Sequence, residues 1–395
     1  MSVERSRRFT ATWVTVIVGV VILATFVRGQ ERQGGERGAG AAAGQGRGEG
    51  RGRGPAMKLS DPVITDPAIQ NGGIDLHAHQ DPDSNGPSYG QAARSDDALD
   101  LYTRAKAAGM RGFVIKEHLD QSAGLAYYLR KLHPEMEIFG GMGSNFTTGP
   151  KVNPWAIIHM TEMKGGWGRI VWMPSWDSEN SSHKVGNYMT TLAPRRAPYF
   201  DPPFVSVARC ADGGRFWANY PKPCDGGDLL PEVKEAIKII ATTKTRDSNG
   251  DLILATGHNS PEEDMMMIKE AVKAGVKHII ITHPLLDVVG MTPAQIKQAV
   301  ALGPEIYAEF VSPFGNQDPS SPIVKQTIEG IRAAGVDHAF VSSDTGQINS
   351  VFQPDALAKC AKVLRANGFT EPELAKLFKV NPAKILGLAP PAGTQ

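Results

Sequence analysis

The chain has 395 residues, 41% of them hydrophobic, which is enough to form one large domain or two smaller ones. Its formal net charge of +1 does not point to a nucleic-acid partner or to an acidic substrate. Three cysteines are too few for a disulfide scaffold, although Cys210 and Cys224 lie close together in a loop-like region. We expect these two to pair in an oxidising compartment and to remain idle thiols in the cytosol.

Residues 1–28 have the pattern of an export signal. Three arginines, Arg5, Arg7 and Arg8, precede an uncharged apolar run from Phe9 to Val27. The run is almost long enough to span a bilayer, and no clean small-x-small cleavage site follows it. We expect a cleaved signal peptide or an uncleaved transmembrane signal anchor, with the body of the protein exported to the periplasm or beyond.

Residues 29–57 are rich in glycine and arginine and have no apolar periodicity, so we expect a disordered linker. The folded domain is expected at 58–395, where apolar strands mostly alternate with amphipathic helices. The predicted strands are 74–76, 111–118, 137–142, 169–174, 252–258, 276–284, 305–310 and 337–344. The predicted helices are 95–108 with Ser95 as its N-cap, 121–132, 231–241, two beginning after Ser260 and Thr292, then 355–367, 371–380 and 381–388.

Eight apolar strands with helices between them predict a parallel sheet, and a closed (β/α)8 TIM barrel is the most economical arrangement of such a sheet. A doubly wound open sheet is the alternative. The chain has no glycine-rich strand-to-helix fingerprint, which weighs against that alternative.

Ionisable side chains collect at the strand C-termini, where a barrel places its active site. They are His77, His79, Lys116, Glu117, His118, His258, His283, Glu309 and Asp344. Because positions two apart on a strand share a face, His77 and His79 should project together. Lys116 and His118 should do the same, with Glu117 on the opposite face. Five imidazoles and an aspartate at such positions predict a divalent metal site.

An HxH motif after the first strand, single histidines after the fifth and sixth, and an aspartate after the eighth resemble the amidohydrolase superfamily of metal-dependent hydrolases. The ending LFKVNPAKILGL is similar to the end of many of its members. The motifs DLHAH, IKEH, TGHNSPEE, ITHP and SSDTGQ more narrowly resemble an uncharacterised amidohydrolase-like family. The likeness covers residues 72–388.

This resemblance implies that His77, His79 and Asp344 bind one metal ion. His258 and His283 would hold a second ion, or one of them would bind the substrate. Many members carry a bridging carboxylated lysine or glutamate at the fourth strand, which has none here. Lys116 is an alternative bridge if it is carboxylated, and otherwise an ordinary paired lysine, while His118 is a possible extra ligand.

The implied activity is hydrolysis of an amide, ester or lactone bond in a small molecule by metal-activated water, with Asp344 as general base and His283 at the reacting centre. Zinc suits the imidazole-rich ligand set best, as one or two ions, and manganese, iron and nickel are alternatives.

The segment 175–230 follows the fourth strand and is predicted to be a lid over the site or an ordinary surface excursion. Its candidate substrate-binding residues are Trp176, Asp177, His183 and Arg195.

Three other functions stay open: phosphoesterase chemistry, decarboxylation on the same scaffold, and a barrel that binds a ligand without catalysis. Phosphoesterases of the polymerase-and-histidinol-phosphatase type usually have a histidine two residues after the late aspartate, where this chain has Gly346.

Overall fold

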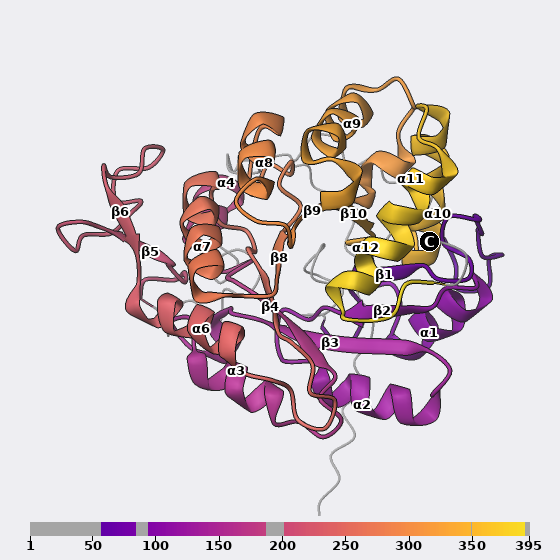
Figure 1. Ribbon diagram of the computed structural model, residues 1–395, viewed down its shortest axis with the longest axis horizontal. Coiled ribbons are helices and arrows are strands. Elements are labelled where there is room, and N and C mark those ends of the chain that lie inside the picture. The colour runs from indigo at the N-terminus through magenta and orange to yellow at the C-terminus, as the bar shows by residue number, and fades with distance from the viewer. Residues whose placement is uncertain (1–56, 84–93, 187–200, 349, 392–395) are drawn as a thin grey trace, which may run out of the picture. The chain divides into compact units, whose positions relative to one another are not determined.

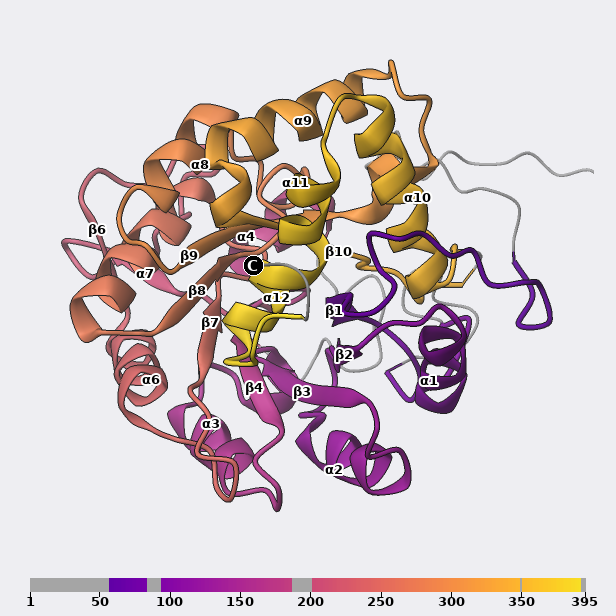
Figure 2. The same ribbon diagram turned by 45° about the vertical axis from the view of Figure 1, so that its right-hand side comes forward.

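Eight parallel strands form the centre of the fold, and helices surround them (Figures 1 and 2). The computed structural model describes residues 57–83, 94–186, 201–348 and 350–391. The strands are β1 (Ile74–Ala78), β2 (Gly112–Ile115), β3 (Glu137–Gly143), β4 (Gly168–Trp172), β7 (Ile253–Ala255), β8 (His278–Ile281), β9 (Ile306–Val311) and β10 (Ala339–Ser342). They pair in this order, all in parallel, so the predicted (β/α)8 barrel is confirmed and the open sheet is wrong.

The barrel closes between the tips of β1 and β10. The amide of Asp344 donates to His77 O (2.9 Å), and the amide of His79 donates to Thr345 O (2.9 Å). The closure therefore joins the HxH motif directly to the chain that carries the late aspartate.

The outer helices follow the strands in the order expected for repeated βα units. They are α1 (Ala98–Ala107), α2 (Ala123–Leu132), α3 (Pro154–Thr161), α6 (Pro231–Thr242), α7 (Pro261–Ala274), α8 (Pro293–Val300), α9 (Pro322–Ala334) and α10 (Gln353–Ala366). The chain ends with α11 (Glu371–Ala375), a π-helical turn (Lys376–Val380) and α12 (Asn381–Ile385), and short 3₁₀ turns lie at Phe146–Thr148, Ser312–Asn316 and Val336–His338.

The N-caps explain where several helices begin. Ser260 and Thr292 cap α7 and α8 as predicted. The predicted Ser95 cap of α1 is wrong, because Asp97 accepts the amides of residues 99 and 100 and starts the helix two residues later. Helices α3 and α9 were not predicted, although each begins with proline after a capping side chain, Asn153 or Ser321.

The hydrophobic core has two layers. One fills the space between strands and helices, and the other fills the barrel lumen with alternate residues of the strands. The lumen layer includes Ile74, Leu76, Val114, Phe139, Ile170, Trp172, Ile253, Ala255, Ile280, Tyr307 and Phe340, together with Ala383, Ile385 and Leu386 of and after α12.

Helix α12 lies at the N-terminal ends of the strands. Asn381 Nδ2 donates to Ala339 O (2.6 Å) at the start of β10, and Arg169 Nη2 donates from β4 to Leu386 O (3.1 Å). This end of the barrel is thus plugged by apolar packing, and the polar site belongs to the opposite end.

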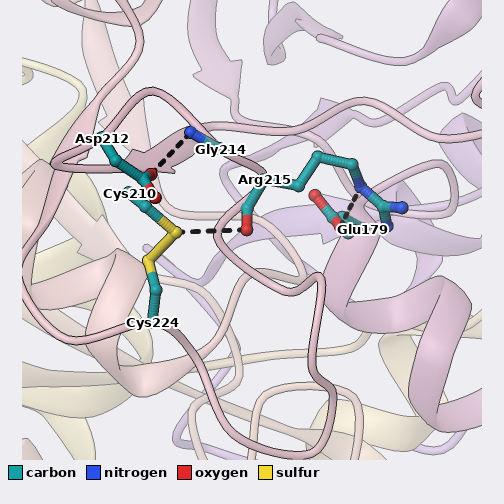
Figure 3. The surroundings of a disulfide bond; sticks show 6 residues. All are labelled: Glu179, Cys210, Asp212, Gly214, Arg215 and Cys224. Carbon is teal, nitrogen blue, oxygen red and sulfur yellow. Dashed lines mark hydrogen bonds and ion pairs between the residues drawn. A yellow bond between two sulfur atoms is a disulfide. The ribbon is translucent and has the colours of Figure 1, made fainter.

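The insertion after β4 contains α4 (Glu179–Val185) and a two-stranded hairpin, β5 (Ala208–Cys210) with β6 (Gly227–Leu229). A disulfide joins Cys210 to Cys224, as expected for an oxidising compartment (Figure 3). Between the two cysteines, Arg215 Nη2 reaches back to Glu179 Oε1 (2.6 Å) on α4. The disulfide therefore closes the loop 210–224, which carries the arginine that pairs with α4.

We expect removal of the disulfide in a Cys210→Ala/Cys224→Ala variant to destabilise the insertion by about 3 kcal/mol, the loop-closure effect for a ring of this size. Urea unfolding followed by the fluorescence of tryptophans, including Trp217 in the insertion, measures this change. Reductant should shift the wild type in the same direction and leave the double variant unchanged. A wild type insensitive to reductant would contradict the prediction.

Among the residues that the structure describes, no helix is both long and apolar enough to cross a membrane. The predicted signal segment 1–28 lies outside the described residues, as does the linker 29–57 apart from Met57.

Candidate metal centre

The rings of the five strand-tip histidines form a continuous row. Neighbouring ring centroids are 4.8 Å apart for His258 and His283 and 5.8 Å apart for His283 and His77. The next distances are 5.0 Å from His77 to His79 and 4.6 Å from His79 to His118. All five residues are buried. The structure thus brings together the imidazoles that the sequence places on four separate strands.

At the middle of the row, two imidazoles converge on one carboxylate oxygen. Asp344 Oδ1 lies 3.3 Å from His77 Nε2 and 3.2 Å from His79 Nε2. The other ring nitrogens are occupied: His77 Nδ1 lies 3.1 Å from Glu309 Oε1, and His79 Nδ1 lies 3.1 Å from Lys116 O. Since both partners can only accept, both Nδ1 atoms carry the proton.

The donor set at this point fits a cation. With the protons on Nδ1, His77 and His79 direct Nε2 lone pairs at an oxygen that is itself a lone-pair donor. Three such atoms repel one another at these distances unless a positive ion lies between them. His77 Nε2 is buried without a hydrogen-bond partner in the described part of the chain, and the three ligand atoms lie within 4.8 Å of one another.

The protonation of the histidines supports the same reading. Burial lowers the pKa of His79, His118 and His258 well below the ordinary 6.5, and that of His283 to about 4. These imidazoles are therefore neutral near pH 7, the form that binds metals.

Glu309 has a supporting role that the sequence analysis did not assign. Its Oε1 fixes the ring of His77, and its Oε2 accepts the amide of His283 (3.3 Å). A carboxylate behind a ligating histidine orients the ring and makes it a stronger donor. The available signal was an acid within a buried apolar strand, since Glu309 lies two residues before the end of β9.

A second group, His79, Asp83 and His118, has ligand-like spacing but is already neutralised by a cation of the protein. Asp83 Oδ2 lies 2.6 Å from Arg94 Nη2 and 2.8 Å from His118 Nδ1. Asp83 Oδ1 accepts the amide of His118 (2.6 Å). This cluster therefore orients His118. No pattern in the sequence predicted this role for Asp83 or Arg94.

Lys116 lies in the lumen next to the histidine row. Its Nζ is 3.4 Å from His118 Nε2, and the side chain is buried. Burial lowers the pKa of Lys116 to about 8. Strand β4 ends in the apolar Trp172, so it supplies no bridging ligand, as expected from the sequence.

The insertion contacts the histidine row at both ends. Trp176 stacks on His118, with 3.7 Å between ring centroids. At the other end, Ser178 Oγ and Asn180 Nδ2 donate to the carbonyl oxygen of His258 at 2.8 Å and 2.9 Å. The insertion therefore packs directly on the tips of β2 and β7.

The other proposed substrate residues are placed differently. Asp177 Oδ2 accepts the amide of Phe146 (3.0 Å), and burial raises the pKa of this carboxyl to about 6. His183 stacks on Tyr220 (4.7 Å between centroids) inside the insertion. Arg195 lies outside the described residues.

Solved structures resemble this chain at low sequence identity. An amidohydrolase from Burkholderia multivorans with bound zinc is 11% identical, with 80% of this chain and 99% of that chain covered and a TM-score of 0.50. A probable 2-pyrone-4,6-dicarboxylic acid hydrolase from Acinetobacter baumannii is 11% identical over 80% of this chain and all (100%) of that chain, with a TM-score of 0.45. A β-aspartyl dipeptidase from Fervidobacterium islandicum is 14% identical over 81% and 74%, also with a TM-score of 0.45.

The zinc-bound amidohydrolase therefore shares the barrel fold of this chain. No curated protein sequence matches the chain. One family profile does, over residues 72–307, a stretch that begins just before β1 and ends in β9. The chain belongs to the family described as a family of unknown function, DUF6282.

Proposed function

We propose that the protein is a metal-dependent hydrolase of a small molecule with an amide, ester or lactone bond. The observation that carries the proposal is the convergence of His77 Nε2, His79 Nε2 and Asp344 Oδ1, with both Nδ1 protons turned away from the meeting point. These three residues would hold a divalent ion, and zinc suits two imidazoles best.

A divalent ion held there would lower the pKa of a bound water from about 15.7 to about 7 and would polarise the oxygen of the bond under attack. Asp344 accepts the proton of the attacking water on its carboxylate and returns it to the leaving group. Glu309 and the carbonyl of Lys116 hold the two imidazoles in one tautomer throughout. Trp176, which stacks on His118, would help to shield the site from bulk water and so strengthen each of these interactions.

His258 and His283 either hold a second ion or bind the substrate. Both have a buried Nδ1 without a hydrogen-bond partner in the described residues, which supports a ligand role. A second ion needs an anionic bridge, and we propose Lys116 for it. Its amine would add to carbon dioxide and release a proton to give a carbamate, which the pKa of about 8 favours. The number of ions bound per chain distinguishes a second metal site at His258 and His283 from a substrate-binding role.

The proposed activity is tested with a panel of an ester, a lactone, an amide and a phosphoester, using protein reconstituted with zinc and protein treated with a chelator. We expect hydrolysis of at least one carbon–oxygen or carbon–nitrogen substrate by the zinc form alone. Turnover of the phosphoester only would favour phosphoesterase chemistry. Equal turnover with and without metal would refute the proposal.

We also propose that the protein works outside the cytosol. The Cys210–Cys224 disulfide supports this location, because disulfides persist mainly in oxidising compartments. Cell fractionation combined with thiol labelling tests it. Recovery in the cytosol with both thiols free would contradict it.

A further inference from the structure

Strand β1 does not keep a regular alternation up to the HxH motif. Leu76 belongs to the lumen core. His77, the next residue, also faces the lumen, where it contacts Glu309 and lies 5.8 Å from the Trp172 ring. Ala78 then packs in the outer layer. Two consecutive side chains therefore point inward.

The pairing with β2 shows the cause. Asp75 pairs with Phe113 and Ala78 pairs with Ile115, so two residues of β1 lie opposite the single residue Val114. This is a β-bulge, which bends a strand and redirects the side chains that follow it. Without the extra residue, alternation would turn His77 and His79 to the helix side of the barrel. The bulge is thus what aims both imidazoles at the metal position.

Asp75 holds the bulge together. Its Oδ1 accepts the amide of His77 (3.1 Å), two residues on, and the amide of Ser343 (3.0 Å) on the far side of the barrel seam. Asp75 is completely buried. Burying a carboxylate is costly unless its hydrogen bonds compensate. An apolar side chain would fill this position at lower cost, so the hydrogen bonds of Asp75 are the reason for an acid here.

The same hydrogen-bonded group also fixes the distance between His77 and Asp344. Ser343 Oγ donates to His77 O (3.1 Å), and the amide of Asp344 donates to the same oxygen (2.9 Å). One carboxylate oxygen of Asp75 therefore ties the backbone of His77 to the backbone immediately before Asp344. The two ligands cannot separate without breaking these bonds.

We propose that Asp75 is a positioning residue of the metal centre. It sets the bulge that turns His77 and His79 inward and fixes the distance between His77 and Asp344. This inference rests on the proposed function, since it assigns Asp75 a task at that metal site. Asp75 precedes Leu76 on β1 and lies on the helix side, so it acts through the ligands and does not bind the ion.

The test is a competition titration of Zn²⁺ against a chelating dye for the wild type and for Asp75→Ala and Asp75→Asn, with the visible spectrum of the Co²⁺ form as a second readout. Asp75→Ala should bind Zn²⁺ about 10- to 100-fold more weakly, the usual cost of losing an outer partner of a ligand, and should alter the Co²⁺ spectrum. Asp75→Asn keeps an oxygen acceptor at Oδ1 and should bind almost as tightly as the wild type.

The matched control is Asn381→Ala. Asn381 is also buried and hydrogen-bonded to β10, but at the opposite end of the strand. It should lower stability and leave Zn²⁺ affinity unchanged. If Asp75→Ala fails to fold, Asp75→Val fills the same space without an oxygen acceptor and should weaken Zn²⁺ binding in the same direction.

Unchanged affinity and an unchanged Co²⁺ spectrum in folded Asp75→Ala would overturn the inference, as would an Asp75→Asn variant as weak as Asp75→Ala. If Asp75→Ala does not fold, unchanged affinity in Asp75→Val would overturn it. A wild type that binds no metal would instead refute the proposed function, and the inference with it.

Discussion

Replacing His77 with alanine is expected to weaken divalent-metal binding by more than about 100-fold and to abolish hydrolysis. This loss is larger than the roughly 10- to 100-fold expected for an outer partner of a ligand, because His77 is proposed to bind the ion itself. The variant also leaves the buried carboxylate of Glu309 without the ring that it now contacts at 3.1 Å, which destabilises the site further. Metal titration and turnover on the same protein preparation measure both losses.

His159→Ala is the matched control, since His159 lies exposed on α3, away from the strand tips. It should keep the metal affinity and activity of the wild type. Tight metal binding by His77→Ala would show that the ion is held elsewhere.

Asp344→Asn is expected to lower kcat by about 100- to 10,000-fold, the range associated with loss of a general base. Asparagine keeps an oxygen near His77 and His79 and tolerates the left-handed backbone at this position (φ 47°), so the fold should survive. It cannot take up a proton from water. Metal binding should weaken far less than kcat falls, and kinetics with metal-saturated protein separate the two effects.

The matched substitution is Asp337→Asn, which lies exposed before the other end of β10 and pairs with Lys376. Its kcat should equal that of the wild type. An Asp344→Asn variant with wild-type kcat at saturating metal would remove the proposed role of Asp344 as base.

The barrel itself could be predicted because its strands are short, continuous apolar runs separated by capped helices. VKHIIITHP and DHAFVSSD, for example, carry His283 and Asp344 just beyond the ends of β8 and β10, where these strands reach the site. In a parallel barrel all strand C-termini meet at one face, so listing those residues was enough to collect the five histidines.

The orientation of the ligands could not be predicted, because three strands depart from alternation at the tip. In β7, Ala255 faces the lumen, so regular alternation would turn the side chain of His258 outward. The left-handed backbone of Gly257 (φ 75°) turns that side chain inward instead. A Cβ at Gly257 would lie 2.3 Å from Met173 O, so the turn also needs glycine for space. His283 itself adopts φ 26°, and β1 uses its bulge.

The supporting residues were missed for a different reason. Asp83 and Glu309 contact histidines that are distant in sequence, whereas Asp75 accepts the amide of His77, two residues on, and that of Ser343 across the barrel seam. A charged residue inside a buried apolar strand, as at Asp75, is the one local sign of such a role. Asp83 and Arg94 follow in loops, where charges are common.

Metal analysis of the purified protein tests the central claim most directly. We predict at least about one zinc-type ion per wild-type chain after reconstitution, removal of that ion and of activity by chelator, and recovery of both when metal is restored. Absence of any stoichiometric transition metal from a folded, reconstituted wild type would contradict the account.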